Sequence, residues 1–202
     1  MKVSDRVSCV DFLCKDIKSE GYLIPDVDIN PRRISIVMIS EVSPQDPEEY
    51  FYASGNPFYL QTTLKAFGDA GLSVSSIEDI LKLGIYITTA VKCAKTGYSI
   101  SSETITNCSM LLEKELALFP DVKVIMLMGD VAIKAMNQIS KRQLGNKVIP
   151  GGSTYKIRKN TYYYGDIRVF PSYILTGKNL LIEKSKMRVI AEDISEAIKL
   201  VK

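Results

Sequence analysis

Short apolar runs alternate along this chain with segments of helical spacing. The runs at 33–40, 85–91 and 122–128 are almost wholly apolar, and a fourth run covers 167–172. Runs of this length that end in turn residues predict buried strands. Strands that alternate with helices form largely parallel sheets covered on both faces. The pattern therefore predicts an α/β fold, and a length of 202 residues suits one domain spanning 1–202.

Helical spacing and capping residues divide the rest of the chain. A serine-rich cap at 75–78 precedes one short helix, and Ser-Ser-Glu at 101–103 opens a longer one. The runs at 154–158 and 161–164 predict a hairpin around Lys159-Asn160. The expected helices are 58–70, a short one from 77 that ends before Gly84, 102–119, one that starts at Gly129-Asp130, and 180–200.

In a largely parallel sheet, ligands bind beyond the carboxyl ends of the strands. In this chain those ends are expected at 40–43, 91–93, 129 and 172–176. Polar residues at these positions are therefore the first candidates for a functional site.

Charge and hydropathy narrow the possible partners. No stretch approaches the roughly 18–20 apolar residues needed to span a bilayer, and the first residues are polar, so we expect a cytoplasmic protein without a membrane partner. Residues 141–190 carry 11 Lys/Arg against 2 Asp/Glu, whereas residues 1–140 carry 13 against 18. A concentrated basic segment either binds the phosphate backbone of a nucleic acid or forms a solvated basic face.

Four cysteines form two short pairs, Cys9 with Cys14 and Cys93 with Cys108. Disulfides rarely persist in the cytoplasm, which favours thiols or metal ligands. Four thiolates suit an iron-sulfur cluster or a structural zinc, and the spacing does not separate the two. Four unlinked buried cysteines are the alternative without a metal.

Several strand ends carry motifs of a known family. Ile-Ser-Glu-Val-Ser-Pro at 39–44 is followed by Gly-Asn-Pro-Phe at 55–58, and the run 85–93 ends in Lys-Cys. Met-Gly-Asp-Val-Ala at 128–132 and Val-Phe-Pro-Ser-Tyr at 169–173 complete the set. Together these segments resemble the uracil-DNA glycosylase superfamily, especially its thermostable iron-sulfur branch, over roughly 34–196.

The resemblance implies a three-layer α/β/α fold and a [4Fe-4S] cluster held by Cys9, Cys14, Cys93 and Cys108, with zinc or no metal as alternatives. Four residues separate Cys9 from Cys14 where two would be expected. The N-terminal pair therefore departs from the family pattern more than Cys93 and Cys108 do.

The resemblance also implies roles for individual residues. Glu41 would stabilise positive charge on the sugar and orient water during cleavage of an N-glycosidic bond, with Asp46 as a further candidate carboxylate. Phe58 would stack on a flipped base. The other expected contacts are Val42, Thr89 and Ser172 to the base, and Thr176, Lys178 and Asn179 to DNA.

Two departures bear on activity. Thr89 stands where family members commonly have asparagine, and the chain has no histidine, although the second motif normally carries one. We expect a monomeric, monofunctional DNA glycosylase of base-excision repair that acts on uracil or another deaminated base. The alternatives are a non-catalytic damaged-DNA-binding protein and, further off, a small-molecule enzyme on the same fold.

Overall fold

The strands form one mixed sheet in a computed structural model that describes residues 1–11, 14–176 and 182–202. The strand order is β1-β3-β2-β4-β6-β5. The four inner strands are parallel, while β1 and β5 pair antiparallel at the two edges. The strands are β1 (Ile17–Lys18), β2 (Ile36–Ser43), β3 (Ile85–Lys95), β4 (Val124–Met128), β5 (Tyr162–Tyr164) and β6 (Ile167–Ser172).

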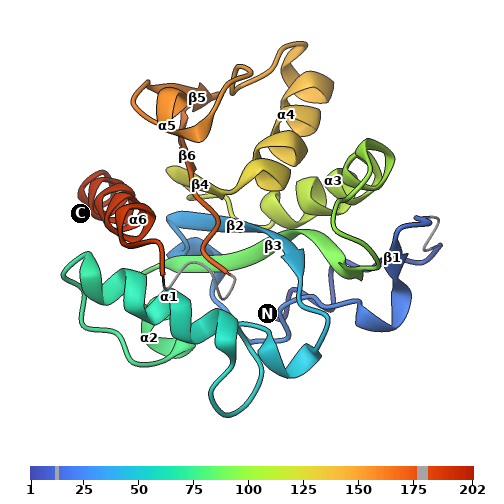
Figure 1. Ribbon diagram of the computed structural model, residues 1–202, viewed down its shortest axis with the longest axis horizontal. Helices are drawn as coiled ribbons and strands as arrows, with labels where there is room; N and C mark the ends of the chain where they lie inside the picture. Colours follow the sequence, from blue (N-terminus) through green and yellow to red (C-terminus); the bar gives the residue numbers. More distant parts are fainter. Residues whose placement is uncertain (12–13, 177–181) are drawn as a thin grey trace.

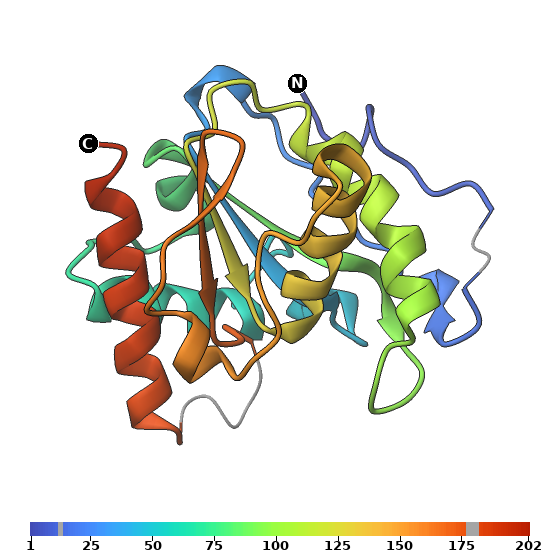
Figure 2. The ribbon, with the colours of Figure 1, turned by 90° about the horizontal axis from the view of Figure 1, so that it is seen from above.

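Helices cover both faces of this sheet, which confirms the predicted three-layer α/β/α architecture. Helices α1, α2 and α6 lie on one face, and α3 and α4 lie on the other (Figures 1 and 2). The helices are α1 (Phe58–Asp69), α2 (Ile77–Lys82), α3 (Ser102–Leu116), α4 (Asp130–Leu144), α5 (Thr154–Ile157) and α6 (Lys184–Lys199), with short 3-10 turns at Ser19–Gly21, Pro31–Arg33 and Pro47–Glu49.

The inner strands bury both of their faces. Successive side chains of a strand point to opposite sides, so Val37 and Ile39 pack with α3 and α4 while Ile36 and Met38 pack with α1 and α6. This double burial explains why the strands read as continuous apolar runs rather than alternating ones.

Two strands extend beyond the ends that the sequence predicts. The structure continues β2 to Ser43 and β3 to Lys95, with a register shift after Val42. Polar residues within the extensions obscure the strand pattern, but pairing between the two strands carries them on. Glu41 and Cys93 therefore lie within strands rather than in loops.

The predicted hairpin around Lys159-Asn160 is wrong. Residues 154–157 form the single helical turn α5, and β5 pairs instead with β6 across Gly165-Asp166. Gly165 has φ +57°, a conformation suited to a tight two-residue turn. A Gly-Asp pair between two strand-like runs was the sequence signal for this turn.

The closing helix also starts later than predicted, at Lys184 rather than Leu180. Residues 177–181 lie outside the described part of the chain. Within the described ranges, no helix is long and apolar enough to cross a bilayer.

Candidate active site and cysteine group

Glu41 is held at the carboxyl end of β2 by the start of α4. Its Oε1 accepts a hydrogen bond from the Val131 backbone N–H at 3.1 Å, and the Asp130 amide also donates to the carboxylate. The amino terminus of a helix carries partial positive charge, which stabilises an anion there. The position immediately before this helix is Gly129.

Gly129 has to be a glycine for this arrangement. Its φ is +115°, and a Cβ on it would collide with the Glu41 carboxylate. The Gly-Asp step at the strand-helix junction thus creates both the space for the carboxylate and the amides that bind it.

Burial raises the pKa of the Glu41 carboxyl above its ordinary value, and the nearby Asp130 charge adds to the rise. The two backbone amides and Lys95 oppose the shift. The site therefore offers a partly desolvated carboxylate at the edge where the sheet's ligands are expected.

The second candidate carboxylate, Asp46, lies on the loop after β2. It is exposed, and its Oδ1 accepts from the Glu48 amide at 3.0 Å, capping a short 3-10 turn. Asp46 thus has a local structural role as the cap of this short turn.

The residues expected to contact a base are mostly committed to the interior. Val42 packs into the core, and Phe58 opens α1 half-buried. Thr89 is fully buried and its hydroxyl pairs with that of Ser43 at 3.3 Å, while Ser172 donates to Asp193 Oδ2 at 2.6 Å. The hydroxyls of Thr89 and Ser172 thus already have protein partners.

The expected DNA contacts divide between buried and undescribed residues. Thr176 is 5% exposed and lies beside the phenol of Tyr59, which also donates to the Val42 carbonyl at 3.5 Å. Tyr59 therefore ties the segment after β6 to the end of β2. Lys178 and Asn179 lie outside the described residues.

The four cysteines come together from three parts of the fold. Cys93 is on β3, Cys108 is on α3, and Cys9 and Cys14 belong to the N-terminal segment, which reaches β3 through β1 (Figure 1). All four are free thiols. Burial raises the pKa of Cys93 to about 12, and the other three thiols add to the rise, so all four lie within electrostatic range of one another.

A cavity of about 290 Å³ opens at this group. Cys9, Cys14 and Cys108 line it, together with Asn107, whose side chain donates to the Cys14 Sγ at 3.9 Å. Within the described ranges, no three Cys, His, Asp or Glu side chains are gathered as ligands of a single metal ion.

Directly behind the cysteines lies a buried ion pair. Lys92 Nζ contacts Glu115 Oε2 at 2.5 Å, with both side chains fully buried. Lys92 also donates to the Thr88 hydroxyl, and Glu115 accepts from Thr88 and from Tyr86. Both the ammonium and the carboxylate thus have further hydrogen-bond partners, which a buried ion pair needs to offset its desolvation.

Sequence reasoning missed this network, although a signal was present. Glu115 follows Ile105, Cys108 and Leu112 at helical spacing, which places it on the buried face of α3. An acid on that face requires an internal partner, and Lys92 is the cation inside an otherwise buried strand.

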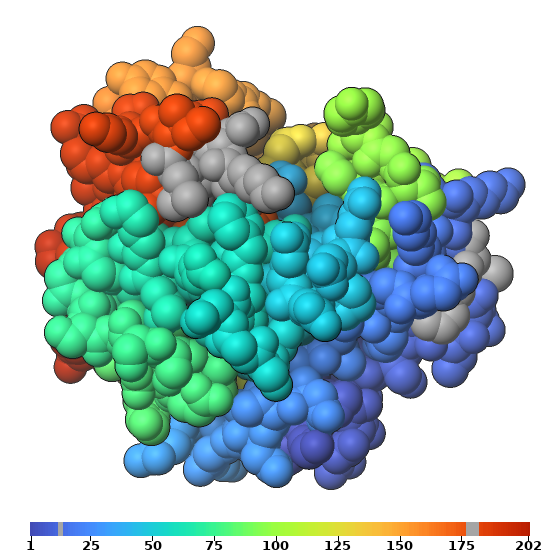
Figure 3. Space-filling model, turned by 60° about the horizontal axis from the view of Figure 1, so that its bottom comes forward, coloured from blue at the N-terminus to red at the C-terminus, as the bar shows by residue number. Residues whose placement is uncertain are grey.

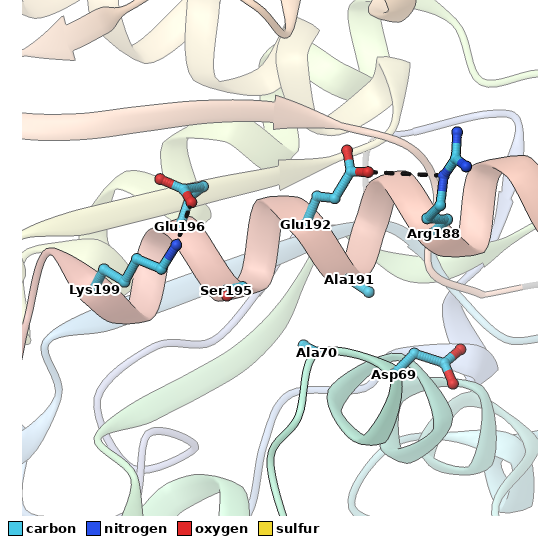
Figure 4. A pocket seen from close by; sticks show the side chains of 8 residues that line it. All are labelled: Asp69, Ala70, Arg188, Ala191, Glu192, Ser195, Glu196 and Lys199. Atoms are coloured by element: carbon cyan, nitrogen blue, oxygen red, sulfur yellow. Dashed lines mark hydrogen bonds and ion pairs between the residues drawn. The ribbon is translucent and has the colours of Figure 1, made fainter.

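A further hollow of about 340 Å³ lies between α1 and α6, away from the strand ends (Figure 4). Its charged side chains pair along α6, Arg188 with Glu192 and Lys199 with Glu196. They do not converge on a common point, so the hollow has no arrangement suited to a ligand.

The four parallel inner strands, covered by helices on both faces and carrying a fixed carboxylate near the end of β2, define an α/β protein with a candidate site at the carboxyl edge of its sheet. A profile of the Uracil DNA glycosylase superfamily matches residues 31–189, and the chain belongs to this superfamily. A curated relative is the Type-5 uracil-DNA glycosylase of Thermus thermophilus, which is 34% identical over 59 residues. That match covers 29% of this chain and 27% of the relative.

Proposed function

We propose that this protein is a monofunctional DNA glycosylase of base-excision repair, which hydrolyses the N-glycosidic bond of a flipped uracil or another deaminated base. Membership of the superfamily supports the class of reaction. The observation that carries the proposal is the Glu41 carboxylate, which is held at the end of β2 by the first amides of α4.

A carboxylate at this place suits the chemistry. Departure of a base leaves positive charge on the sugar and negative charge on the base, so a fixed carboxylate near the sugar stabilises the cation and orients the attacking water. Because the α4 amides fix Glu41 before the reaction, little reorganisation is needed as charge develops. Phe58, half-buried at the start of α1, would stack on the extruded base.

The negative charge on the leaving base lacks a histidine donor, since the chain contains none. The Ser172 hydroxyl is bound to Asp193, and Thr176 is buried beside Tyr59. Loss of one preorganised donor lowers a rate by about a hundred- to a thousandfold. We therefore expect slow turnover compared with enzymes that have the histidine.

The second candidate function is a damaged-DNA-binding protein without base excision. Two observations favour it: the absent histidine and the buried hydroxyls of Thr89 and Ser172, which already have protein partners. In either case we propose a cytoplasmic, single-domain monomer whose partner is DNA.

Base release from singly modified oligonucleotides, both single- and double-stranded, tests the proposal. The panel contains uracil, hypoxanthine, xanthine and alkylated bases. Glu41→Gln keeps the size of the side chain and an oxygen for the Val131 amide, so the variant should fold but release base at least about a hundredfold more slowly. Asp46→Asn should retain activity.

Equal loss in both variants would contradict the assignment of Glu41 as the acting carboxylate. DNA binding with no release from any substrate would select the binding-protein function. A protein that neither binds DNA nor releases base would refute both.

We also propose that Cys9, Cys14, Cys93 and Cys108 hold a [4Fe-4S] cluster. A donor set made only of thiols suits iron-sulfur or zinc. The four thiols lie within electrostatic range of one another, and three of them line one cavity, which supports a shared centre. When bound, the cluster would cross-link the N-terminal segment to β3 and α3.

Anaerobic purification followed by iron, sulfide and zinc analysis tests this assignment. We expect a brown protein with absorbance near roughly 400 nm, which Cys93→Ser and Cys108→Ser abolish. A colourless protein that contains zinc, or one that contains no metal, would refute the cluster.

A further inference from the structure

In the basic segment, several cations lie over aromatic rings. Within the described residues, every cation–π pair falls between 155 and 186: Lys159 over Tyr155, Arg168 over Tyr163 and Phe170, and Lys186 over Tyr173. Such pairs occur roughly once per 70–80 residues in proteins, so this clustering is unusual. We call the exposed group on and beside α5, Tyr155, Lys156 and Lys159, the aromatic–basic surface.

The side chains of this surface are open to solvent. Tyr155 is 62% exposed. Lys156 and Lys159 are also exposed, and within the described ranges neither forms an ion pair with an acidic side chain. Arg158 between them is different, because it binds Asp193 at 2.6 Å. The two lysines thus keep their charge available to a partner.

The surface adjoins the strand-end site. Arg158 binds Asp193 of α6, and Asp193 in turn accepts from Ser172, the last residue of β6. Helix α5 is therefore fastened at the carboxyl end of β6, the edge that also carries Glu41. Figure 3 shows the orange segment around residues 150–165 beside the red-orange start of α6 on one face of the molecule.

The chemistry of this surface fits unpaired nucleotides. A base can stack on a tyrosine only when its π face is uncovered, which a duplex prevents and a single strand allows. A lysine held beside the ring meets the phosphate of the same nucleotide, and it replaces counterions condensed on the backbone. A tyrosine ring with a lysine beside it can therefore bind the base and the phosphate of one nucleotide.

We propose that the aromatic–basic surface binds single-stranded DNA that flanks the base held at the strand-end site. The inference rests on the proposed function, and it deepens that function by assigning a single-stranded or locally melted substrate. Tyr155 provides the stacking platform, and Lys156 and Lys159 bind the neighbouring phosphates.

Fluorescence anisotropy with a labelled oligothymidylate of about 15 nucleotides and a duplex of the same length tests the surface. Tyr155→Ala should weaken binding of the single strand about fivefold to about a hundredfold, while duplex affinity changes little. Tyr155→Phe keeps the ring and should bind like the parent protein. Lys159→Ala should lower the slope of log affinity against log salt by about one.

Lys141→Ala is the matched control for charge, because Lys141 is an exposed lysine at the far end of α4, away from the strand ends. Equal single-strand affinity in Tyr155→Ala and the parent protein would overturn the inference. An equal loss for single strand and duplex would also overturn it, since the surface would then bind DNA in general.

These outcomes are separable from failure of the proposed function. If the Tyr155→Ala variant binds single strands normally while the parent protein releases bases, only the surface assignment fails. If the parent protein neither binds DNA of either form nor releases base, the proposed function fails together with the surface.

Discussion

The position of the Glu41 carboxylate depends on a neighbouring residue without a side chain. Gly129 has a positive φ and lies against that carboxylate. Any other residue there would reduce stability twice, through backbone strain and through the collision with Glu41. The motif at 128–132 locates this junction in the sequence, but it reveals neither the positive φ nor the contact with Glu41.

Gly129→Ala should lower the free energy of unfolding by about 1–3 kcal/mol or more, because a Cβ meets both the unfavourable φ and the carboxylate. Urea denaturation measures the loss. Gly145→Ala is the control, since Gly145 also has a positive φ, +76°, but open space around its Cα. Equal losses in the two variants would show that the collision with Glu41 costs nothing.

The raised pKa of Glu41 predicts how its contribution to stability changes with pH. A carboxyl whose folded pKa lies above its unfolded value favours the native state most at low pH, and the benefit fades as pH rises through the folded pKa. Relative to Glu41→Gln, the parent protein should therefore lose stability as pH rises from below about 4.5 toward neutrality. Denaturation of both proteins across this range measures the difference, and the opposite trend would mean that the α4 amides outweigh desolvation.

At the scale of elements, β3 combines a structural and a chemical role. Its carboxyl half carries Lys92 into the interior and Cys93 to the cysteine group, while α3 supplies Glu115 and Cys108 to the same two places. The buried ion pair therefore fixes the strand and helix that present two of the four thiols.

Glu115→Leu should destabilise the protein by about 3–5 kcal/mol, because it leaves the Lys92 ammonium buried without a counter-charge. The double variant Lys92→Met/Glu115→Leu should recover part of the loss, although Tyr86 would still lack its acceptor. Equilibrium unfolding of the two single variants and the double variant gives the coupling. Simple additivity of the single losses would contradict a coupled pair.

At the scale of the whole molecule, β1 and β3 lie at the end of the sheet with the cysteine group, and β6 and β5 lie at the other end, beside α5 (Figure 1). Strand β2, which carries Glu41, lies between them. The N-terminal segment is anchored before Cys9 by buried Val3 and Val7, and after Cys14 by Asp16, which accepts from Ser101. Between these anchors, Cys9 and Cys14 face the cavity of the cysteine group.

Removal of the proposed cluster should expose the segment between the two anchors. Trypsin should then cut after Lys15, an exposed residue beside Cys14, faster in iron-depleted protein than in loaded protein. Mass spectrometry of timed digests measures the cleavage, with cleavage after Lys141 as the internal reference. Equal rates at Lys15 in both forms would show that no metal centre holds this segment.

The sequence by itself determined the layers of the fold and the sheet edge that carries Glu41. Buried parallel strands require continuous apolar runs, and helices require capping residues and spacing, so local pattern and architecture agree at β2, β4, α3 and α4. The same reasoning put the hairpin turn at Lys159-Asn160 instead of Gly165-Asp166, because short polar-aromatic runs carry little periodicity.

Only the tertiary structure decided which polar groups face one another. Hydroxyls of Thr89 and Ser172, which the sequence places at strand ends, turn inward to Ser43 and Asp193. Glu41 meets the amides of α4, and Lys92 meets Glu115 across 23 positions of the chain. Such pairings depend on strand register and helix packing between distant segments, and these long-range contacts leave no local pattern in the sequence.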